Sequence, residues 1–271
     1  MPRTSIREFF DNSVDPPVRG FLHLPDVANG SALVLTHGAG SNARAPLLVA
    51  LAETFSAAGF AVLRCDLPYR QSRSFGPPGS GDAARDRAGL KNAVDALKKA
   101  LGAPLLPGVG RSGDFPGSDP SAVAPLLSRS LRQGEDKIFL GGHSYGGRQA
   151  SILCSEEPDL VSGLLLLSYP LHPPRRPEQQ RTAHLPSLRT PTLFVHGTCD
   201  PFGSIAEIER AIKMIPAATK LLAVEGAGHD LGFNGKAKQQ DLPARIFSAF
   251  HVFFNRRGPE SAMPDRGSQG G

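Results

Sequence analysis

Short apolar runs, most of them followed by glycine or a polar turn, recur along the chain. Two runs, at residues 5–10 and 18–24, flank the turn Asp15-Pro16-Pro17 and predict a pair of antiparallel strands. Six further runs are almost continuously apolar, as expected for strands buried on both faces of a parallel sheet. These runs lie at residues 31–36, 61–65, 137–141, 163–168, 192–196 and 220–225.

Segments with helical periodicity lie between these runs. In residues 81–101, the apolar residues Leu90, Val94, Leu97 and Leu101 recur at spacings of four, three and four, which places them on one helical face. The other predicted helices lie at residues 45–58, 148–157, 204–215 and 237–254. This alternation predicts one α/β domain over residues 1–255, with a mostly parallel central sheet, helices on both faces and right-handed crossovers.

Three segments do not follow the alternation. Residues 102–136 are rich in Pro, Gly and Ser, with only a short possible helix at 122–131, so we expect a flexible insert. Residues 256–271 are polar and rich in glycine, which predicts a disordered tail. Residues 168–190 are too few for a large lid domain and predict a short cap segment.

Composition and charge exclude several classes of protein. The chain is 40% apolar and 20% charged, as in globular proteins, and its longest apolar run, residues 47–52, is too short to span a bilayer. The net charge of +5 comes from scattered lysines and arginines without interleaved aromatics, so we expect no nucleic-acid partner and no membrane partner.

The cysteines and the N-terminal residues bear on the compartment. The three cysteines, Cys65, Cys154 and Cys199, lack CxxC spacing, which argues against a disulfide framework or a zinc site. The first 17 residues lack the apolar core of a signal peptide. We therefore expect a cytoplasmic protein that uses no metal and no other cofactor. The pattern predicts no particular oligomeric state.

The segment GGHSYGG, residues 141–147, carries the first sign of chemistry. It contains G-x-S-x-G between the apolar run IFLG and a helical pattern, which is the context of a nucleophile elbow. Such a turn forces Ser144 into a strained conformation and exposes its hydroxyl at a helix N-terminus. A glycine-rich turn without chemistry has the same pattern, so residues that could act as base and acid for Ser144 are needed to distinguish a nucleophile from a structural turn.

A serine hydroxyl needs a histidine as base, and the histidine needs a carboxylate to hold its tautomer. In the elbow arrangement the acid and then the histidine follow the serine, each after a later strand. Asp200 follows the run TLFVHG, and His229 follows LLAVEG. The rival Asp230 is badly placed to bond the ring of its own neighbour, and the rival Glu225 is expected within a strand, pointing away.

Other residues near strand ends have alternative roles. Of the eight histidines, His37 and His196 are favoured as structural, hydrogen-bonded residues, and His143 is expected to pack below the serine. An oxyanion hole needs two backbone N–H groups, for which we predict those of Tyr145 and Ala39. A merely tight turn at His37-Gly38-Ala39-Gly40 remains the alternative for Ala39.

With these residues in place, residues 5–254 resemble the α/β-hydrolase superfamily, in which HGAG, GGHSYGGR, HGTCDPFG and GAGHDL stand in this order. The segments GGHSYGGRQAS, RCDLPYR and SYPLHPPRRPEQQRTAHLP are similar to bacterial predicted hydrolases. Those are related to the testis-expressed and KANSL-type α/β-hydrolase-like proteins and, more distantly, to dienelactone hydrolases. The resemblance implies the fold and the Ser-His-Asp triad. Ser144, in place of the dienelactone hydrolases' cysteine, argues against that specific reaction.

Four side chains are candidates for substrate binding at the mouth of the site: Arg70, Arg148, Tyr169 and His172. Arginines there would select a substrate that bears a carboxylate or a phosphate. The alternative, which we favour, is that the arginines are solvated or paired with Asp66 and Asp82.

The sequence therefore predicts a serine hydrolase that cleaves a small ester or thioester through an acyl-enzyme intermediate. Two alternatives remain open. One is an oligopeptidase, because the run Ser-Tyr-Gly-Gly also occurs in prolyl-oligopeptidase-like enzymes. The other is a non-enzymatic interaction module that kept the fold.

Overall fold

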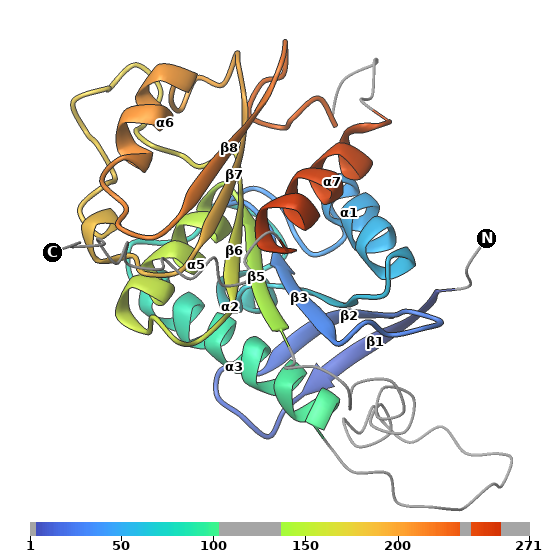
Figure 1. The fold of residues 1–271 in the computed structure, drawn as a ribbon. Helices are drawn as coiled ribbons and strands as arrows, with labels where there is room; N and C mark the ends of the chain where they lie inside the picture. Colours follow the sequence, from blue (N-terminus) through green and yellow to red (C-terminus); the bar gives the residue numbers. More distant parts are fainter. Residues whose placement is uncertain (1–3, 103–136, 234–239, 256–271) are drawn as a thin grey trace, which may run out of the picture.

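The computed structural model describes residues 4–102, 137–233 and 240–255, and in these residues eight strands form one sheet (Figure 1). The strand order is β1-β2-β4-β3-β5-β6-β7-β8. The strands are β1 (Ser5–Asp11), β2 (Val18–Leu24), β3 (Ser31–Thr36), β4 (Ala61–Cys65), β5 (Lys137–His143), β6 (Gly163–Leu167), β7 (Thr192–Gly197) and β8 (Thr219–Val224).

The sheet is parallel except around β2, which pairs antiparallel with both β1 and β4. From β3 the chain goes to β4 on one side and then to β5 on the other side of β3. The loops after β3 and β5 therefore leave the sheet in opposite directions, and such a switch point opens a crevice at the carboxyl ends of the strands. Thr36 is paired with Gly142, so the loop after β3 begins beside the end of β5.

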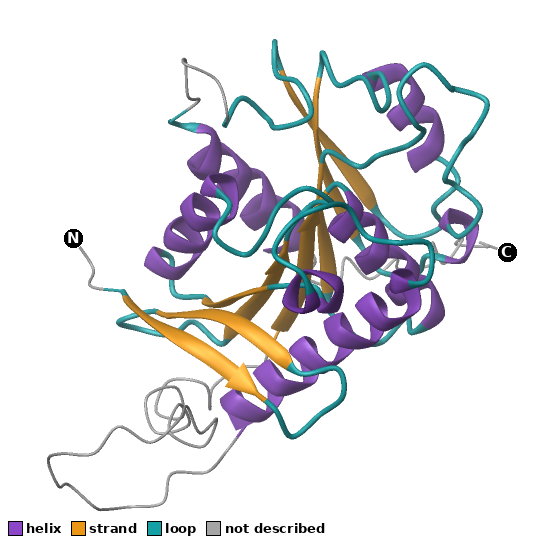
Figure 2. Cartoon of the chain, turned by 180° about the vertical axis from the view of Figure 1, so that it is seen from behind, coloured by secondary structure: helices purple, strands orange, loops and turns teal. Residues whose placement is uncertain are grey.

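Helices cover both faces of the sheet, as Figures 1 and 2 show from opposite sides. Helices α1 and α7 pack on one face, and α3 and α5 pack on the other, to which α6 also contributes Ile208 and Ala211. The helices are α1 (Pro46–Ala57), α2 (Pro68–Ser72), α3 (Asp82–Gly102), α5 (Tyr145–Glu156), α6 (Ile205–Ile212) and α7 (Leu242–Asn255), with a 3₁₀ turn η3 (Leu185–Ser187).

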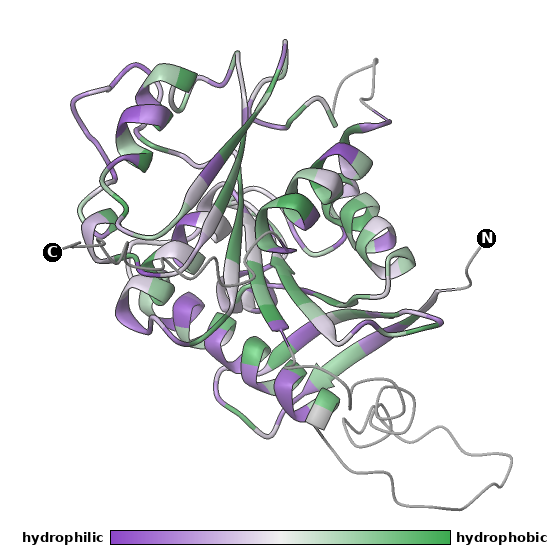
Figure 3. Cartoon of the chain, in the orientation of Figure 1, coloured by the Kyte–Doolittle hydropathy of each residue, from purple (hydrophilic) through white to green (hydrophobic). Residues whose placement is uncertain are grey.

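The core is divided by the sheet into two apolar layers, and the central strands are mainly green in the hydropathy colouring of Figure 3. Under α1 and α7 the packing is largely aromatic. Phe250 meets Phe139 and Phe55 edge to face, with ring centroids 4.8 Å and 5.0 Å apart, and contacts the tilted ring of Phe254 at 4.5 Å. These rings hold α7 against the sheet.

The fold class predicted from the sequence is confirmed, and the eight predicted strands lie within two residues of those observed. One interpretation was wrong: the run at 220–225 is not buried, because β8 is the edge strand and most of its residues are partly exposed. The structure also adds α2, which the pattern did not predict because a five-residue helix is too short to show periodicity.

Helix α7 begins later than predicted. The sequence placed its start at residue 237, whereas the helix begins at Leu242. Pro243 explains the difference, because proline lacks an N–H group and is tolerated only in the first turn of a helix.

The predicted insert, from residue 103 to 136, and the predicted tail at 256–271 lie outside the described residues, as does the short helix at 122–131. The predicted cap segment, residues 168–190, is described and contains no regular element apart from η3. Within the described ranges, no helix is both long enough and apolar enough to cross a membrane.

Candidate active site

Ser144 lies at the sharp turn between β5 and α5, where the sequence predicts an elbow. Its backbone has φ 50° and ψ −116°, a left-handed conformation that costs a non-glycine residue about 1–3 kcal/mol. The flanking glycines make the turn possible. A Cβ on Gly146 would lie 2.4 Å from the carbonyl oxygen of His37, and one on Gly142 would lie 2.5 Å from the backbone nitrogen of Gly147.

Three loops bring a hydroxyl, an imidazole and a carboxylate together at this turn. The hydroxyl oxygen of Ser144 is 2.7 Å from Nε2 of His229. Nδ1 of His229 is 2.8 Å and 3.0 Å from the two carboxylate oxygens of Asp200. With Nδ1 donating to Asp200, Nε2 is left as the acceptor for the serine proton. Asp200 follows β7 and His229 follows β8, as the sequence predicts.

Asp200 is held from several sides and is only 6% exposed. Its Oδ1 accepts the backbone N–H of Phe202 at 2.9 Å. Nε2 of His196 lies 3.7 Å from Oδ2 and donates to the carbonyl of Gly203 at 2.8 Å. A carboxylate with these partners is fixed in orientation before any substrate arrives.

The ring of His229 is flanked by those of Phe202 and His143. The ring of Phe202 lies over it with centroids 4.1 Å apart. Nε2 of His143 donates to the backbone carbonyl of His229 at 2.7 Å, and burial lowers the pKa of His143 to about 4. His143 therefore lies beside the His229 loop rather than only below the serine, and it stays neutral near pH 7.

The rivals considered from the sequence bond elsewhere. An oxygen of Asp230 accepts the backbone N–H of Gly232 at 3.0 Å. Glu225 follows β8 rather than lying within it, and accepts from the hydroxyl of Thr198 at 3.4 Å. His37 is buried, with Nδ1 donating to Gly38 and Nε2 accepting from Leu67, which agrees with a structural histidine.

The two N–H groups predicted to form an oxyanion hole belong to loops that meet at Ser144. A Cβ on Gly38, next to Ala39, would lie 3.3 Å from Cβ of Ser144. Tyr145 is the first residue of α5, so its N–H has no acceptor within the helix. Among the described residues, neither the N–H of Ala39 nor that of Tyr145 donates to a protein group.

The structure places three of the four predicted substrate-binding residues in contacts within the protein. Arg70 is 8% exposed and donates to the backbone carbonyls of Ala39, Ser41, Arg73 and Gly76. Tyr169 is buried and donates to the carbonyl of Arg181. His172 is buried and donates to the carbonyl of Pro173. These contacts use most of the polar groups of Arg70 and Tyr169, whereas Nε2 of His172 is buried and has no hydrogen-bond partner among the described residues.

Arg148 is the fourth predicted substrate-binding residue. It lies one helical turn after Ser144 in α5 and faces the cap segment. Burial together with the charge of Arg148 lowers the pKa of His184 to about 4. Nε of Arg148 is buried and has no hydrogen-bond partner in the described part of the chain. Arg148 thus keeps a hydrogen-bond donor that no described protein group uses.

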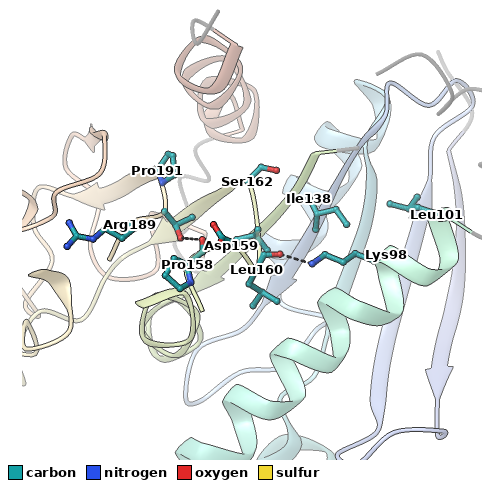
Figure 4. A pocket seen from close by; sticks show the side chains of 11 residues that line it. Lys98, Leu101, Ile138, Pro158, Asp159, Leu160, Ser162, Arg189 and Pro191 are labelled. Carbon is teal, nitrogen blue, oxygen red and sulfur yellow. Dashed lines mark hydrogen bonds between the residues drawn. The ribbon is translucent and has the colours of Figure 1, made fainter. Parts of the chain in front are cut away.

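Two hollows lie at opposite ends of the sheet. One, of about 120 Å³, adjoins the site. It is lined by His37, Gly38, Ser41, Ala45, Pro46, Leu47, Leu48, His143, Asp230 and Phe233. The other, of about 550 Å³, lies where β5, β6 and β7 begin, between Lys98, Ile138 and Pro191 (Figure 4). The larger hollow therefore lies at the opposite end of the sheet from Ser144.

No group of three or more potential metal ligands occurs in the ranges that the structure covers. The groups that the structure brings together at the site are the hydroxyl of Ser144, the imidazole of His229 and the carboxylate of Asp200.

Comparison with known proteins agrees with this architecture. Residues 121–251 match a family model described as "Alpha/beta hydrolase domain". A dienelactone hydrolase from Anabaena variabilis superposes over 94% of this chain and 98% of its own, with a TM-score of 0.60 and 19% identity. The chain has the α/β-hydrolase fold.

Two other solved structures are similar to this chain. An α/β serine hydrolase without lid from Xanthomonas campestris covers 96% of this chain and 97% of its own, with a TM-score of 0.61 and 14% identity. Est1E from Butyrivibrio proteoclasticus, solved with ferulic acid bound, covers 94% and 96%, with a TM-score of 0.57 and 15% identity. At these identities the likeness extends to the fold.

One curated relative matches over a short stretch. The polyketide synthase ThaQ of Burkholderia thailandensis is 54% identical over 48 residues, which are 18% of this chain and 2% of that protein. The chain therefore corresponds to a very small part of that relative's length.

Several residues around the site were not found from the sequence. Phe202 stacks on His229, and Tyr69 and Asp86 contact the loops that carry Ala39 and Tyr145. The segments containing Tyr69 and Phe202 were visible as RCDLPYR and HGTCDPFG, but their contacts depend on tertiary structure. Asp86 lies in a helix with an ordinary polar pattern and gave no signal.

Proposed function

We propose that the chain is a serine hydrolase that cleaves small esters or thioesters through an acyl-enzyme intermediate. The observation that carries the proposal is the continuous hydrogen-bonded chain from Ser144 Oγ through His229 to Asp200, with distances of 2.7 Å and 2.8 Å. A serine beside a histidine that a buried carboxylate orients is the arrangement that activates a hydroxyl as a nucleophile.

In the first half of the proposed reaction, Oγ of Ser144 attacks the carbonyl carbon and His229 Nε2 takes the hydroxyl proton. The carbonyl π electrons move to oxygen, and the N–H groups of Ala39 and Tyr145 stabilise that negative charge. When the tetrahedral intermediate collapses, the bond to the leaving group breaks. His229 returns the proton to the leaving alcohol or thiol.

In the second half, water replaces the alcohol. His229 takes a proton from a water molecule while the water oxygen attacks the acyl carbon. His229 then gives that proton to Oγ of Ser144 as the ester bond to the serine breaks. Asp200 stabilises the imidazolium that forms twice in the cycle without itself accepting the proton. The products are the free acid and the regenerated serine.

A small substrate is favoured by the surroundings of the site. The hollow beside His143 holds about 120 Å³ and is lined mainly by small or apolar side chains, which suits a short apolar group. The short cap at residues 168–190 contains no regular element apart from η3, and a similar fold has been solved as a serine hydrolase without lid. Est1E with bound ferulic acid is a precedent for small carboxylic-acid ligands on this fold.

Among the residues considered for substrate recognition, we keep Arg148 as a candidate because its Nε is buried without a partner among the described residues. Preference for a substrate that carries an anionic group would support this role. An unchanged preference in Arg148→Met would exclude it.

The test is steady-state hydrolysis of p-nitrophenyl acetate, an acyl thioester and a peptide p-nitroanilide by the wild type, Ser144→Ala and His229→Ala. We expect the wild type to hydrolyse the ester and thioester, and both variants to lose about 10⁴-fold or more in kcat while remaining folded. Comparable turnover of the anilide would favour an oligopeptidase. No turnover of any substrate by folded wild type would favour a non-enzymatic module.

A further inference from the structure

The segment RCDLPYR, residues 64–70, has no part in the chemistry proposed above, yet its groups contact the loop that follows β3. The segment comprises the end of β4, a short turn and the start of α2. The loop it contacts is residues 37–44, which includes Ala39.

The N–H of Ala39 and the carbonyl of Gly38 belong to the same peptide unit. Because that unit is planar and trans, its C=O and N–H point in opposite directions. The carbonyl of Gly38 accepts from Nδ1 of His37 at 2.9 Å and lies 3.2 Å from the hydroxyl of Tyr69, whose single proton is shared between this oxygen and the carbonyl of Ala39. Holding this carbonyl therefore fixes the direction in which the N–H of Ala39 points.

The segment also sets the tautomer of His37. The backbone N–H of Leu67 donates to Nε2 of His37 at 3.1 Å, so the ring proton resides on Nδ1, facing Gly38. Burial lowers the pKa of His37, so the ring is neutral near pH 7. The Asp66 carboxylate lies 3.5 Å from the same Nε2 and accepts the backbone N–H of Ala43 at 2.7 Å.

Further along the loop, the backbone is held by side chains of the same segment. The hydroxyl of Tyr69 is 2.8 Å from the carbonyl oxygen of Ala39. Arg70 donates to the carbonyl of Ala39 at 3.2 Å and to that of Ser41 at 2.7 Å. Arg64 donates to the carbonyl of Ala43. Peptide units on both sides of Ala39 are thus bonded to residues 64–70.

A buried carboxylate links this loop to the other proposed oxyanion donor. Asp86 is fully buried and accepts the backbone N–H of Tyr69 at 3.0 Å and the hydroxyl of Tyr145 at 2.7 Å. The rings of Tyr69 and Tyr145 meet edge to face with centroids 5.9 Å apart. The N–H of Tyr145 itself is oriented by α5, because the carbonyl of Ser144 accepts from the N–H of Arg148 at 2.9 Å.

We propose that residues 64–70 together with Asp86 act as an oxyanion clamp, which holds the N–H of Ala39 in the direction needed to bind the developing negative charge. Tyr69 and Arg70 are its positioning residues; they contact the loop and not the substrate. The inference rests on the proposed function, because it assumes that Ser144 attacks a carbonyl at this site. It gives the arginine at residue 70 a role in kcat rather than in recognition of an anion.

The first test is Tyr69→Phe, which removes the hydroxyl and keeps the ring. Because the loss acts on the transition state, kcat should fall about 10- to 100-fold, less than the loss of a whole oxyanion donor, with KM within two-fold. The affinity of an alkylboronic acid, which forms a tetrahedral adduct on the serine, should fall by the same factor as kcat/KM. A role confined to stability would leave that affinity unchanged in the folded variant.

The matched control is Thr190→Val, which also removes a buried hydroxyl that donates to a backbone carbonyl. Thr190 is 1% exposed, donates to the carbonyl of Pro158 at 3.2 Å and lines the hollow where β5, β6 and β7 begin, at the other end of the sheet from Ser144. Its kcat and boronic-acid affinity should equal those of the wild type.

Arg70→Lys and Arg70→Met supply the second test, should Tyr69→Phe fail to fold. A lysine keeps the charge but cannot reach several carbonyls at once, so both variants should lose kcat about 10-fold or more, equally for neutral and anionic esters. A KM that rises only for anionic esters, and only in Arg70→Met, would overturn the clamp and restore a substrate-binding role.

The outcome separates this inference from the proposed function. Wild type that fails to hydrolyse any ester contradicts the proposed function. Active wild type with a folded Tyr69→Phe of unchanged kcat and unchanged boronic-acid affinity contradicts the clamp alone.

Discussion

Asp200 is the residue whose contribution depends most on what surrounds it. It is almost fully buried, accepts from His229 and from the N–H of Phe202, and lies close to His196. In this position a carboxylate both orients the imidazole of His229 and stabilises its protonated form. A neutral amide of the same shape would do neither.

We therefore expect Asp200→Asn to lower kcat about 10³- to 10⁴-fold, because the amide allows the wrong tautomer of His229. Steady-state ester hydrolysis near neutral pH measures this loss of kcat. The matched control is Glu225→Gln, which changes the exposed rival carboxylate and should keep near-wild-type activity. A drop below 10-fold in Asp200→Asn would remove Asp200 from the proposed triad.

Gly146 shows how closely the elbow is packed. A Cβ there would lie 2.4 Å from the carbonyl oxygen of His37 and 2.6 Å from Cγ2 of Thr36, so β3 and its loop would have to move. We expect Gly146→Ala to lower the free energy of unfolding by about 1–3 kcal/mol, as overpacking does, and to reduce kcat. Denaturant titration measures the loss of unfolding free energy. The control is Gly81→Ala, because a Cβ on Gly81 meets nothing within 4 Å. Equal stability of the two variants would contradict it.

At the residue scale, the sequence predicted candidate site residues from their order after successive strands. It missed the residues whose place near the site depends only on tertiary contacts. Ser144, Asp200 and His229 were predicted because each follows a recognisable strand. Arg70 was interpreted as a candidate for an anionic substrate, but the structure shows its guanidinium bonded to backbone carbonyls. No spacing rule distinguishes those two uses of an arginine.

Among the elements, apolar runs predicted the strands well and the helix boundaries less well. A buried strand is nearly continuous in apolar residues, whereas the start of α7 depends on where Pro243 can be accommodated. The edge strand β8 was mistaken for a buried one because Leu221 and Leu222 are apolar, although the sheet leaves one of its sides without a neighbouring strand. Strand order is a tertiary property that a single run does not contain.

Helix α7 should owe its position to its aromatic face. Phe250 is 1% exposed and contacts the rings of Phe55, Phe139 and Phe254. Phe250→Ala should therefore lower the free energy of unfolding by about 3–5 kcal/mol, from lost burial plus a cavity. Phe75→Ala is the control: Phe75 is 82% exposed, and its loss should cost less than about 0.5 kcal/mol. Urea titrations measure both losses of unfolding free energy. Similar losses for Phe250→Ala and Phe75→Ala would contradict the packing described.

For the molecule as a whole, buried neutral histidines couple stability to pH. Burial, and then the charge of Arg64, lowers the pKa of His23 to about 4, and burial lowers that of His143 and His184 to about 4. His23 is fully buried and its Nε2 accepts from Nε of Arg64 at 2.9 Å, a bond that protonation would remove. An unfolded chain takes up these protons near pH 6.5.

The folded pKa values thus lie below the unfolded ones. Above about pH 6.5 neither state is protonated, and between about pH 6.5 and 4 mainly the unfolded state binds protons, so the free energy of unfolding falls as pH falls. Each such histidine contributes a slope of at most about 1.4 kcal/mol per pH unit. Urea titrations from pH 7 to 4.5 should show this loss. His23→Gln, which keeps an acceptor for Arg64, should have a smaller slope, and an unchanged slope would contradict the assignment.

At the same scale, the fold explains why distant segments meet. Parallel strands end at one edge of the sheet, so the loops after β3, β5, β7 and β8 converge where the chain changes direction. The sequence could predict this convergence because it follows from strand direction alone. It could not predict the side chains from α2 and α3 that support the site, because helix packing decides their contacts.

The central claim is that Ser144 is a nucleophile activated by His229, and covalent labelling with a fluorophosphonate tests it most directly. Intact mass and peptide mapping should show one adduct, on Ser144, in native protein. Labelling should be absent in Ser144→Ala and much slower in folded His229→Ala. Folded wild type that stays unlabelled, or an equal adduct in Ser144→Ala, would contradict the account.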